Sequence, residues 1–186
     1  RTKCADKILL HQYSEEMLGK DICVPILKIY NNPDEIDFKE LPEKFVLKCN
    51  HGYAMNIVVD QKKNSMIILR GRLNSEAECK KRIKEWLNTN FGEKNYQKHY
   101  AMIQPKCYAE KMLEDDRQRT SLFDYKFWCF KGIPKFMSIN NDLGHGNMAY
   151  FDMDFKKIDM DRLGFGELEN PQKPINFNLM KEYATT

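Results

Sequence analysis

Short runs of apolar residues, separated by polar turns, dominate the middle of this sequence and predict a protein rich in β-strands. Runs of strand length occupy 45–49, 55–60 and 66–70, and the polar residues QKKN separate the last two. The segment 124–139 predicts a hairpin, because two aromatic strands flank Lys131 and Gly132. The run 148–155 also alternates as a strand does. We therefore expect antiparallel sheets in both halves of the chain.

Helical periodicity is confined to a few segments. Residues 5–18 repeat apolar side chains at every fourth position, and 76–90 follows a capping box formed by Ser75 and Glu78. Gly92 is placed to end that second helix, and a last helix begins after Asn176. The run 22–30 contains Pro25, which favours an edge strand. Helices and strands do not alternate one for one, so the pattern predicts an α+β fold.

Length and composition narrow the possibilities further. The chain has 186 residues, enough for one domain or two small lobes, and a net charge of +3, which is too small to indicate a nucleic-acid or membrane-surface partner. Its longest apolar runs have four or five residues, so we expect no membrane span. The six cysteines are scattered without CxxC spacing. We interpret them as reduced core thiols of a cytoplasmic protein. The chain does not begin with Met, and we expect it to be a fragment.

One turn combines residue types that suit an anion site. There is no GxxxxGK[ST] and no GxGxxG in the sequence, but the strand 45–49 carries Lys48 and is followed at once by Asn50, His51 and Gly52. Backbone N–H groups in a glycine turn can bind an anion, and a nearby ammonium adds a positive charge. A solvated lysine beside an ordinary tight turn is the more common arrangement.

Two other strands carry charged residues between apolar ones. Glu110 and Lys111 lie in such a strand, whose backbone and carboxylate can pair with a flat heterocycle, although an ordinary strand with outward-facing charges is the more common arrangement. Asp124 and Lys126 share a strand face with Trp128. That group suits a phosphate or a nucleobase, but an ion pair on a solvated sheet face is the simpler interpretation.

Two further patterns suit catalysis or metal binding. Asp152 and Asp154 form a D-x-D tripeptide, which on one strand face can bind Mg²⁺ or Mn²⁺ together with a nucleotide-sugar diphosphate. Solvated acid pairs are common, and Asp159 and Asp161 repeat the spacing a few residues later. His145, in the glycine-flanked segment GHGN, is a candidate catalytic base or an exposed loop residue.

Taken in order, the segments LPEKFVLKCNHG, HYAMIQPKCYAEK and DYKFWCFKGIPKF resemble the TupA-like branch of the ATP-grasp superfamily. The resemblance runs from CADK near the start to the final helix, and FVLKCNHG and DYKFWCFKG are its most specific parts. It implies two α+β lobes that hold ATP between antiparallel sheets. Residues 1–42 would form an N-terminal helix and leading segment, 43–105 the first lobe, 106–114 an interlobe segment and 115–186 an incomplete second lobe.

The resemblance also implies roles for individual residues. Lys48 would contact the α- or β-phosphate of ATP, and the loop from Asn50 to Asn56, with His51 and Gly52, would cover the phosphates. The backbone from Glu110 through Lys111 to Met112 would bind adenine, and Lys126 with Asp124 would line the pocket from the second lobe. With ATP and Mg²⁺, the implied chemistry is phosphorylation of a carboxylate and attack of an amine on the acylphosphate.

The sequence departs from the family pattern in two places. The family loop usually reads NHGSGxN, whereas this chain reads NHGYAMN, so Tyr53 and Ala54 replace small residues and the positive-φ conformation is at risk. Relatives also continue past the last helix into a strand whose glutamate binds Mg²⁺. We therefore expect this chain to lack its main metal ligands, and we do not assign that role to Glu167, although FGEL occurs at 165–168.

Three functions remain open on the sequence. The first is an ATP-dependent carboxylate–amine ligase of bacterial cell-surface polysaccharide and teichuronopeptide synthesis, acting on a carboxylate-bearing glycan or peptide. The second is a glycosyltransferase of the same polymers that uses Asp152 and Asp154 for its metal. The third is a catalytically silent binding module.

Overall fold

The computed structural model describes residues 2–19, 22–68, 71–94, 96–114, 122–141, 146–160 and 164–185. The chain divides into two compact units, Arg1–Leu113 and Glu114–Thr186. Each unit has its own sheet and its own hydrophobic core. None of the helices in the described ranges is long and apolar enough to cross a membrane.

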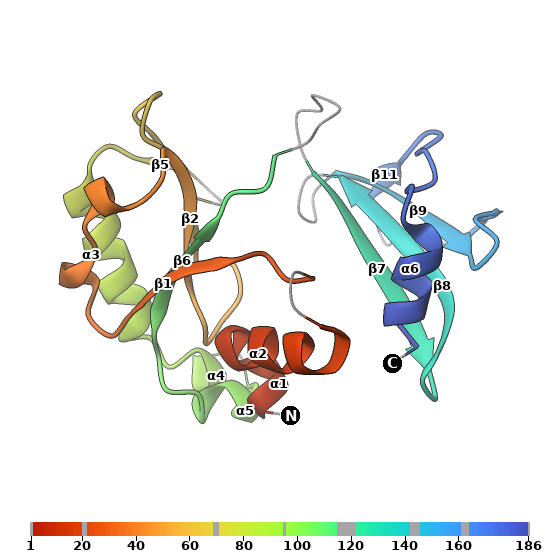
Figure 1. Cartoon of the computed structure of the whole chain (residues 1–186), viewed down its shortest axis with the longest axis horizontal. Coiled ribbons are helices and arrows are strands. Elements are labelled where there is room, and N and C mark those ends of the chain that lie inside the picture. Colours follow the sequence, from red (N-terminus) through yellow and green to blue (C-terminus); the bar gives the residue numbers. More distant parts are fainter. Residues whose placement is uncertain are drawn as a thin grey trace. The chain divides into compact units, whose positions relative to one another are not determined.

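The first unit is built on a six-stranded sheet in the order β1-β6-β2-β3-β4-β5, with every neighbouring pair antiparallel (Figure 1). Its strands are β1 (Ile26–Tyr30), β2 (Lys44–Cys49), β3 (Asn56–Asp60), β4 (Ser65–Ile68), β5 (Gly71–Leu73) and β6 (Cys107–Lys111). The predicted strands at 45–49, 55–60 and 66–70 are thus confirmed, although residues 69 and 70 lie outside the described part. β1 follows Pro25 and is an edge strand, as predicted.

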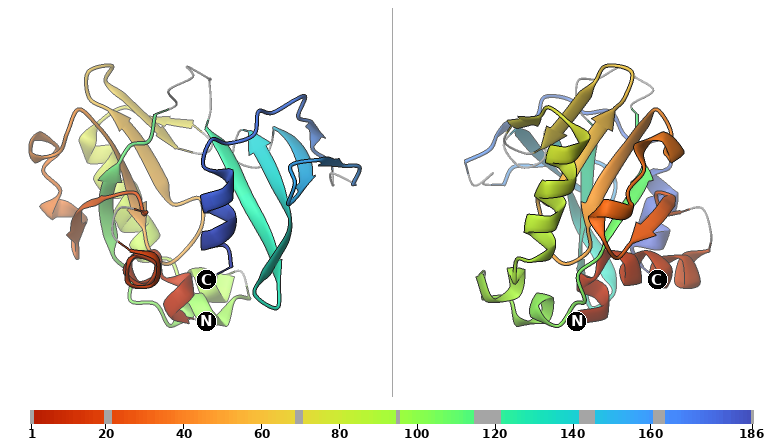
Figure 2. Two further views of the ribbon diagram at one scale, coloured as in Figure 1. Left: turned by 45° about the vertical axis from the view of Figure 1, so that its right-hand side comes forward. Right: turned by 90° about the vertical axis from the view of Figure 1, so that its left-hand side faces the viewer.

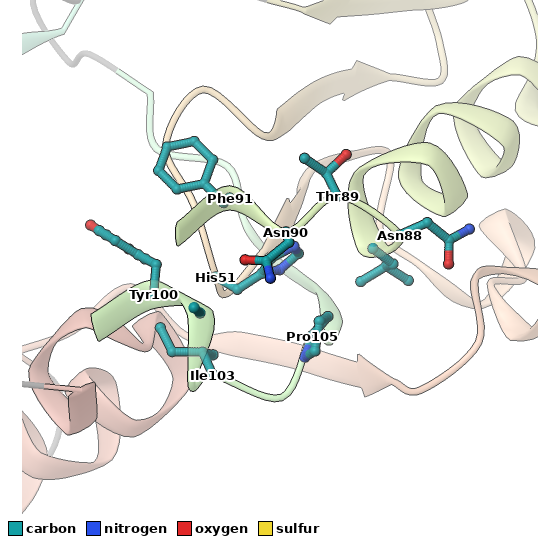
Figure 3. Close-up of a pocket in the computed structure, with 10 residues that line it drawn as sticks. His51, Asn88, Thr89, Asn90, Phe91, Tyr100, Ile103 and Pro105 are labelled. Atoms are coloured by element: carbon teal, nitrogen blue, oxygen red, sulfur yellow. The ribbon is translucent and has the colours of Figure 1, made fainter. Parts of the chain in front are cut away.

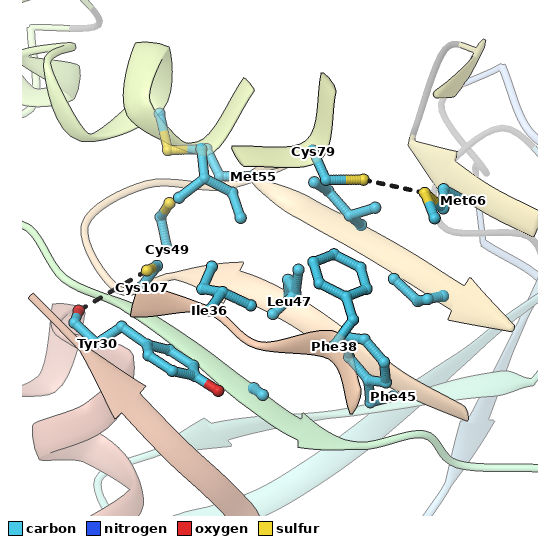
Figure 4. Packing of buried hydrophobic residues seen from close by; sticks show 14 of the residues in the cluster. Tyr30, Ile36, Phe38, Phe45, Leu47, Cys49, Met55, Met66, Cys79 and Cys107 are labelled. Atoms are coloured by element: carbon cyan, nitrogen blue, oxygen red, sulfur yellow. Dashed lines mark hydrogen bonds between the residues drawn. The ribbon is translucent and has the colours of Figure 1, made fainter. Parts of the chain in front are cut away.

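Alternation along these strands places the core of the first unit on one sheet face. In β2, Phe45, Leu47 and Cys49 are fully buried, and the register sets them beside Ala109 and Cys107 of β6. Figure 4 shows this cluster, in which the Cys79 thiol lies 3.3 Å from the Met66 sulfur. Each large apolar side chain buried here contributes about 1.5–3 kcal/mol relative to exposure. The opposite face of the same sheet carries the polar residues Lys48 and Glu110 together with Val46.

Helices pack around this sheet. They are α1 (Thr2–Ala5), α2 (Lys7–Leu18), η1 (Pro33–Glu35), η2 (Phe38–Glu40), α3 (Glu76–Leu87), α4 (Phe91–Lys94) and α5 (Lys98–Ala101). α3 buries Cys79 and Ile83 in the core, and Figure 2 shows it lying along the sheet. Its Ser75 cap is confirmed, since the Ser75 hydroxyl accepts from the Glu78 N–H at 3.2 Å.

Two details of the predicted α3 helix are wrong. The Glu78 carboxylate accepts from the N–H of Asn74 at 2.8 Å, and α3 ends at Leu87, with Asn88 as its C-cap, before the predicted end. In α2 the four-residue repeat does not mark the buried side. Ile8 is buried, whereas Leu9, Tyr13 and Met17 are exposed.

The second unit has a smaller sheet in the order β10-β9-β8-β7, with β11 pairing parallel to β9. Its elements are β7 (Phe123–Phe130), β8 (Ile133–Asn141), β9 (Asn147–Asp152), β10 (Lys157–Ile158), β11 (Gly166–Glu167) and α6 (Phe177–Tyr183). The predicted hairpin is confirmed: Lys131 and Gly132 both have positive φ, 52° and 75°, which suits the right-handed twist of a two-residue turn. α6 begins after Asn176 as predicted, but the Asn176 side chain makes no cap hydrogen bond.

Packing in the second unit uses the odd-numbered positions of β8 and β9. Met137, Ile139, Ala149 and Phe151 are buried together with Phe177 of α6. Figure 2 shows α6 lying along the strands. With two sheets whose neighbours are mainly antiparallel and few helices, the predicted α+β class is confirmed.

The cysteines follow the prediction only in part. All six are free. Burial raises the pKa of Cys49 and of Cys107 to about 12, and that of Cys79 to about 11, so these thiols are unreactive at neutral pH. Cys4 and Cys129 are exposed, however, so the expectation that every cysteine lies in the core is wrong.

Candidate functional site

The strand register of the first unit gathers several predicted site residues on the sheet face opposite the core. Lys48 lies directly across from Asn56 on β3 and from Tyr108 on β6. Glu110 lies one pair further along, opposite Val46. Residues two apart share a face of a strand, so Lys48, Asn56 and Glu110 belong to a single polar group.

Lys48 forms an ion pair with Glu110 on this face. Their side chains are only 29% and 11% exposed, so the pair is partly withdrawn from water. Burial and the Glu110 carboxylate both raise the pKa of the neighbouring Tyr108 phenol, which therefore stays protonated at neutral pH. The ammonium and the phenol are hydrogen-bond donors, and the carboxylate is an acceptor beside them.

Lys7, which the sequence patterns did not single out, belongs to the same neighbourhood. It follows the N-cap Asp6 of α2, and its ammonium donates to the Gly52 carbonyl in the β2–β3 turn. Burial lowers the pKa of Lys7, and the charge of Lys48 lowers it further. A bound anion would offset the electrostatic repulsion between these two ammonium groups. A lysine in the first turn of a helix, where positive charge is unfavourable, was the available signal.

Asn50 connects three distant segments instead of facing a ligand. Its amide donates to the Asp6 carboxylate and to the Gln104 carbonyl, both at 3.0 Å, and its side-chain oxygen accepts from the Lys106 N–H at 2.8 Å. The residue is 1% exposed. Its hydrogen-bonding groups are satisfied within the protein, so the Asn50 side chain fixes the β2–β3 turn to these neighbouring segments.

His51 also points away from the polar face. Its ring is buried, and its Nε2 lies 3.0 Å from the Trp86 carbonyl at the end of α3. Burial lowers the pKa of His51, against the opposing effect of the carbonyl contacts, so the ring is neutral at pH 7. A buried neutral imidazole held against α3 is not placed to attract phosphate through charge.

The backbone of the turn retains the shape that the sequence put in doubt. Ala54 adopts a left-handed φ of 58°, a conformation that favours glycine, so the backbone of the turn is strained at this residue. Gly52 is needed for a different reason. A Cβ added there would lie 2.8 Å from the Phe91 ring and 2.9 Å from the Met55 sulfur. Gly52 therefore allows the turn to pack closely on α4.

Lys111 and Met112 lie at the end of β6. The Lys111 N–H donates to the Pro25 carbonyl at 3.0 Å, so that donor is already used in the sheet. The Lys111 side chain is exposed, and Met112 follows the strand in a half-buried position. Within the segment predicted to bind adenine, the backbone beyond Lys111 therefore lies outside the hydrogen-bonded pairing of β6.

In the second unit, Asp124 and Lys126 lie on one face of β7, as predicted. Their side chains form an ion pair at 2.6 Å, and both are substantially exposed. Trp128 continues the same face and stacks on Phe136 of β8, with ring centroids 5.6 Å apart. An ion pair next to an aromatic surface fits both interpretations drawn from the sequence.

The expected placement of the D-x-D pair on one strand face is wrong. Asp152 ends β9, while Asp154 lies in the turn that follows. One Asp152 oxygen accepts from the N–H groups of Asp154 and Lys156, at 2.9 and 2.8 Å. These backbone bonds, that from Lys156 first, lower the Asp152 pKa. Asp152 thus stabilises a turn. His145 and Asp161 lie outside the described residues.

A scan against models of protein families matched the TupA-like ATPgrasp family over residues 1–185. Searches of curated proteins and of solved structures each found no match. The family match spans both compact units and all the candidate residues described above. On this match, the chain belongs to the TupA-like ATP-grasp family.

Proposed function

We propose that this protein is an ATP-dependent carboxylate–amine ligase that works through an acylphosphate. Membership of an ATP-grasp family supports a nucleotide-dependent activity in general. The observation that carries the proposal is the polar face of the first unit, where Lys48, Glu110 and the nearby Lys7 combine donors with a carboxylate acceptor.

In this proposal Lys48 and Lys7 bind the phosphates of ATP. Each now has an internal partner, Glu110 and the Gly52 carbonyl respectively, and a phosphate would compete for both. Charge-assisted hydrogen bonds from two ammonium groups would stabilise the extra negative charge of phosphoryl transfer. The turn 50–56 lies over the phosphates, and Asn56 contributes an amide across from Lys48.

The remaining predicted residues have supporting roles. Glu110, once released from Lys48, accepts from the amino group of adenine, and the backbone of Lys111 and Met112 borders the base. For the second unit, the resemblance implies that Lys126 and Asp124 of β7 contact the nucleotide, and that role stays a prediction. The acceptor is a carboxylate-bearing glycan or peptide of the bacterial cell surface, modified in the cytoplasm. That pathway rests on the family resemblance alone.

ATP-grasp chemistry also implies Mg²⁺, which would neutralise phosphate charge when bound. Within the described ranges, no group of three or more His, Cys, Asp or Glu side chains is placed to hold a metal ion. The residues present therefore do not make a metal site that we can name. We derive no step through the metal, and the roles above concern only this chain's own side chains.

Calorimetric titration with ATP in the presence of Mg²⁺ tests the proposal on Lys48→Met and Lys7→Met. Each substitution removes one ammonium and keeps an unbranched side chain, and we expect the dissociation constant to rise about tenfold or more, since hydrogen bonds to charged groups are worth about 1.5–3 kcal/mol. UDP-glucose serves as the second ligand, because the glycosyltransferase alternative predicts that it binds instead.

Lys63→Met is the matched control. Lys63 lies in the turn between β3 and β4 of the same unit, with its side chain 76% exposed. We expect the Lys63→Met variant to bind ATP with the same dissociation constant as the unaltered protein. Equal losses in all three variants, or no ATP binding in a folded protein, would contradict the proposed site.

A further inference from the structure

Three hydrogen bonds join the first turn of α2 to the β2–β3 turn. The Asn50 side-chain amide donates to Oδ2 of Asp6 at 3.0 Å, and the Lys7 backbone N–H donates to the Asn50 carbonyl at 3.2 Å. The Lys7 ammonium makes the third bond, to the Gly52 carbonyl. A helix from the start of the chain is thereby fixed to the turn that the proposed function places over the phosphates.

The two carboxylate oxygens of Asp6 have different partners. Oδ1 caps α2, where it accepts from the N–H groups of Ile8 and Leu9 at 2.9 and 3.3 Å, and Oδ2 accepts from Asn50. Asp6 is 8% exposed, so water does not readily replace a bond that is lost there. Serine or asparagine, each with one side-chain oxygen, would cap the helix equally well. The cap therefore does not account for the second oxygen.

The Asn50 amide is held in one orientation by two backbone groups. Its side-chain oxygen accepts from the Lys106 N–H at 2.8 Å, and its amide nitrogen donates to the Gln104 carbonyl at 3.0 Å. An amide that is fixed at its oxygen and at one N–H directs its remaining N–H along a set line, and that line ends on Asp6.

A different set of residues packs the β2–β3 turn against α3 and α4. Nε2 of His51 lies 3.0 Å from the Trp86 carbonyl, and the Phe91 ring leaves no room for a Cβ at Gly52. Figure 3 shows His51 and Phe91 on this side of the turn. These contacts bring no positive charge to the turn, whereas the contacts with α2 bring the ammonium of Lys7.

We propose that Asp6 is a positioning residue for Lys7: by holding the first turn of α2 on Asn50, it keeps the Lys7 ammonium at the phosphate turn. This role depends on the proposed binding of ATP phosphate by Lys7. Asp6 acts through Lys7 and not on the ligand, because a carboxylate repels phosphate. Its charge also helps to keep Lys7 protonated. Burial lowers the pKa of Lys7, whereas the Asp6 carboxylate acts in the opposite direction.

Asp6→Ser separates the two functions of Asp6, since serine caps a helix but is too short to reach Asn50 as well. In the absence of nucleotide, we expect hydrogen exchange at the Lys7 N–H to accelerate about tenfold, while the N–H groups of Ile8 and Leu9 keep their protection. NMR follows these amides individually. Ser75→Ala is the matched control, because it removes the cap of α3 in the same unit and should leave exchange at Lys7 unchanged.

Calorimetric titration with ATP in the presence of Mg²⁺ then tests the consequence for the nucleotide. We expect Asp6→Ser to raise the dissociation constant by about threefold to tenfold. Removal of a carboxylate near phosphate would by itself lower that constant, so the sign of the change is diagnostic. In the Lys7→Met background, Asp6→Ser should cause no further rise, and Ser75→Ala should bind ATP as the unaltered protein does.

Unchanged exchange at Lys7 in Asp6→Ser would overturn the positioning role. So would ATP binding that Asp6→Ser leaves unchanged although Lys7→Met weakens it. An equal loss of affinity from Asp6→Ser with and without the Lys7 ammonium would overturn it as well, since that result indicates a general loss of structure. If Lys7→Met binds ATP normally, the proposed phosphate role of Lys7 is wrong and the positioning role falls with it. The exchange measurement uses no nucleotide and so distinguishes the two failures.

Discussion

Ala54 carries backbone strain at a position where the family sequence has glycine. Its φ of 58° lies in the left-handed region, which costs an L-residue about 1–2 kcal/mol. Ala54→Gly removes that strain but adds freedom to the unfolded chain, so we expect a net stabilisation of about 0.5–1 kcal/mol. Thermal unfolding should show a rise in Tm of roughly 1–4 °C.

Lys81→Gly is a control of opposite sign. Lys81 is exposed in the interior of α3, where glycine is less favourable than lysine by roughly 0.5–1 kcal/mol. If Ala54→Gly lowers Tm as Lys81→Gly does, then the turn does not hold Ala54 in the left-handed conformation.

His51 makes stability depend on pH in a predictable direction. Burial lowers its pKa in the folded state below the unfolded value of about 6.5. As pH falls through that value the unfolded chain binds a proton that the folded ring refuses, so the free energy of unfolding decreases until the folded pKa is reached. We expect the unaltered protein to lose stability between about pH 7.5 and 5, measured by urea denaturation. His51→Gln should lose less over the same range, and parallel curves would contradict the assignment.

For single residues, the sequence predicted which positions gather at the site better than it predicted where their side chains point. Lys48, Asn56 and Glu110 share a face because strand alternation is local and readable. The inward orientation of Asn50 and His51 depends on partners far along the chain, near Lys106 and Trp86. No local pattern reports such partners. Whether these residues bind ATP stays a prediction.

At the scale of elements, a single substitution should stabilise the turn of the β7–β8 hairpin. Lys131 holds a φ of 52° beside Gly132, and asparagine tolerates that conformation better than lysine. We expect Lys131→Asn to stabilise the second unit by about 0.5 kcal/mol. The chain has two tryptophans, so Trp128 fluorescence in a Trp86→Phe background reports on this unit.

Lys135→Asn is the comparison for that experiment. Lys135 is exposed in β8 at the residue that the β7–β8 register leaves without a partner, so Lys135→Asn should change the stability little. A stabilising effect of both substitutions would indicate a change of charge and not of turn geometry.

Elements with strong local signals were the ones that sequence predicted well. α3 has its Ser75 cap, and the hairpin has its Lys131-Gly132 turn. The predictions that failed concern what surrounds an element. Asp154 falls outside β9 because Asp152 caps a turn there, and the Glu78 carboxylate accepts from the N–H of Asn74 in place of that of Ser75. In α2, Ile8 is buried while Leu9, Tyr13 and Met17 are exposed, so period alone does not show which side of an element meets the core.

At the scale of the whole molecule, the two separate cores predict that a destabilising substitution in one unit affects mainly that unit. Leu47 is fully buried in the first unit, and Leu47→Ala should cost about 2–5 kcal/mol. Hydrogen exchange should then accelerate in β2, β3 and β6 more than in β8 and β9. Ile139→Ala, in the core of the second unit, should give the reverse pattern. Equal acceleration in both units by either variant would show that they unfold as one.

The fold class was predictable because it depends on the total pattern of strands and helices, which tolerates errors at element ends. The α+β prediction holds although α3 is shorter than expected. The pattern of strands and helices alone does not place the division after Leu113, since that division depends on which strands pair. β6 follows the helices of the first unit but inserts between β1 and β2, and no local signal announces that pairing.

The Asn50 contacts also carry information about the order of folding. They join residues separated by 44, 54 and 56 positions, so they require three remote stretches of chain to meet. Closing such large loops is entropically slow, and contacts of this kind form late. During refolding, the hairpin of the second unit should gain protection before the amides around Asn50, and competence to bind nucleotide should be acquired last.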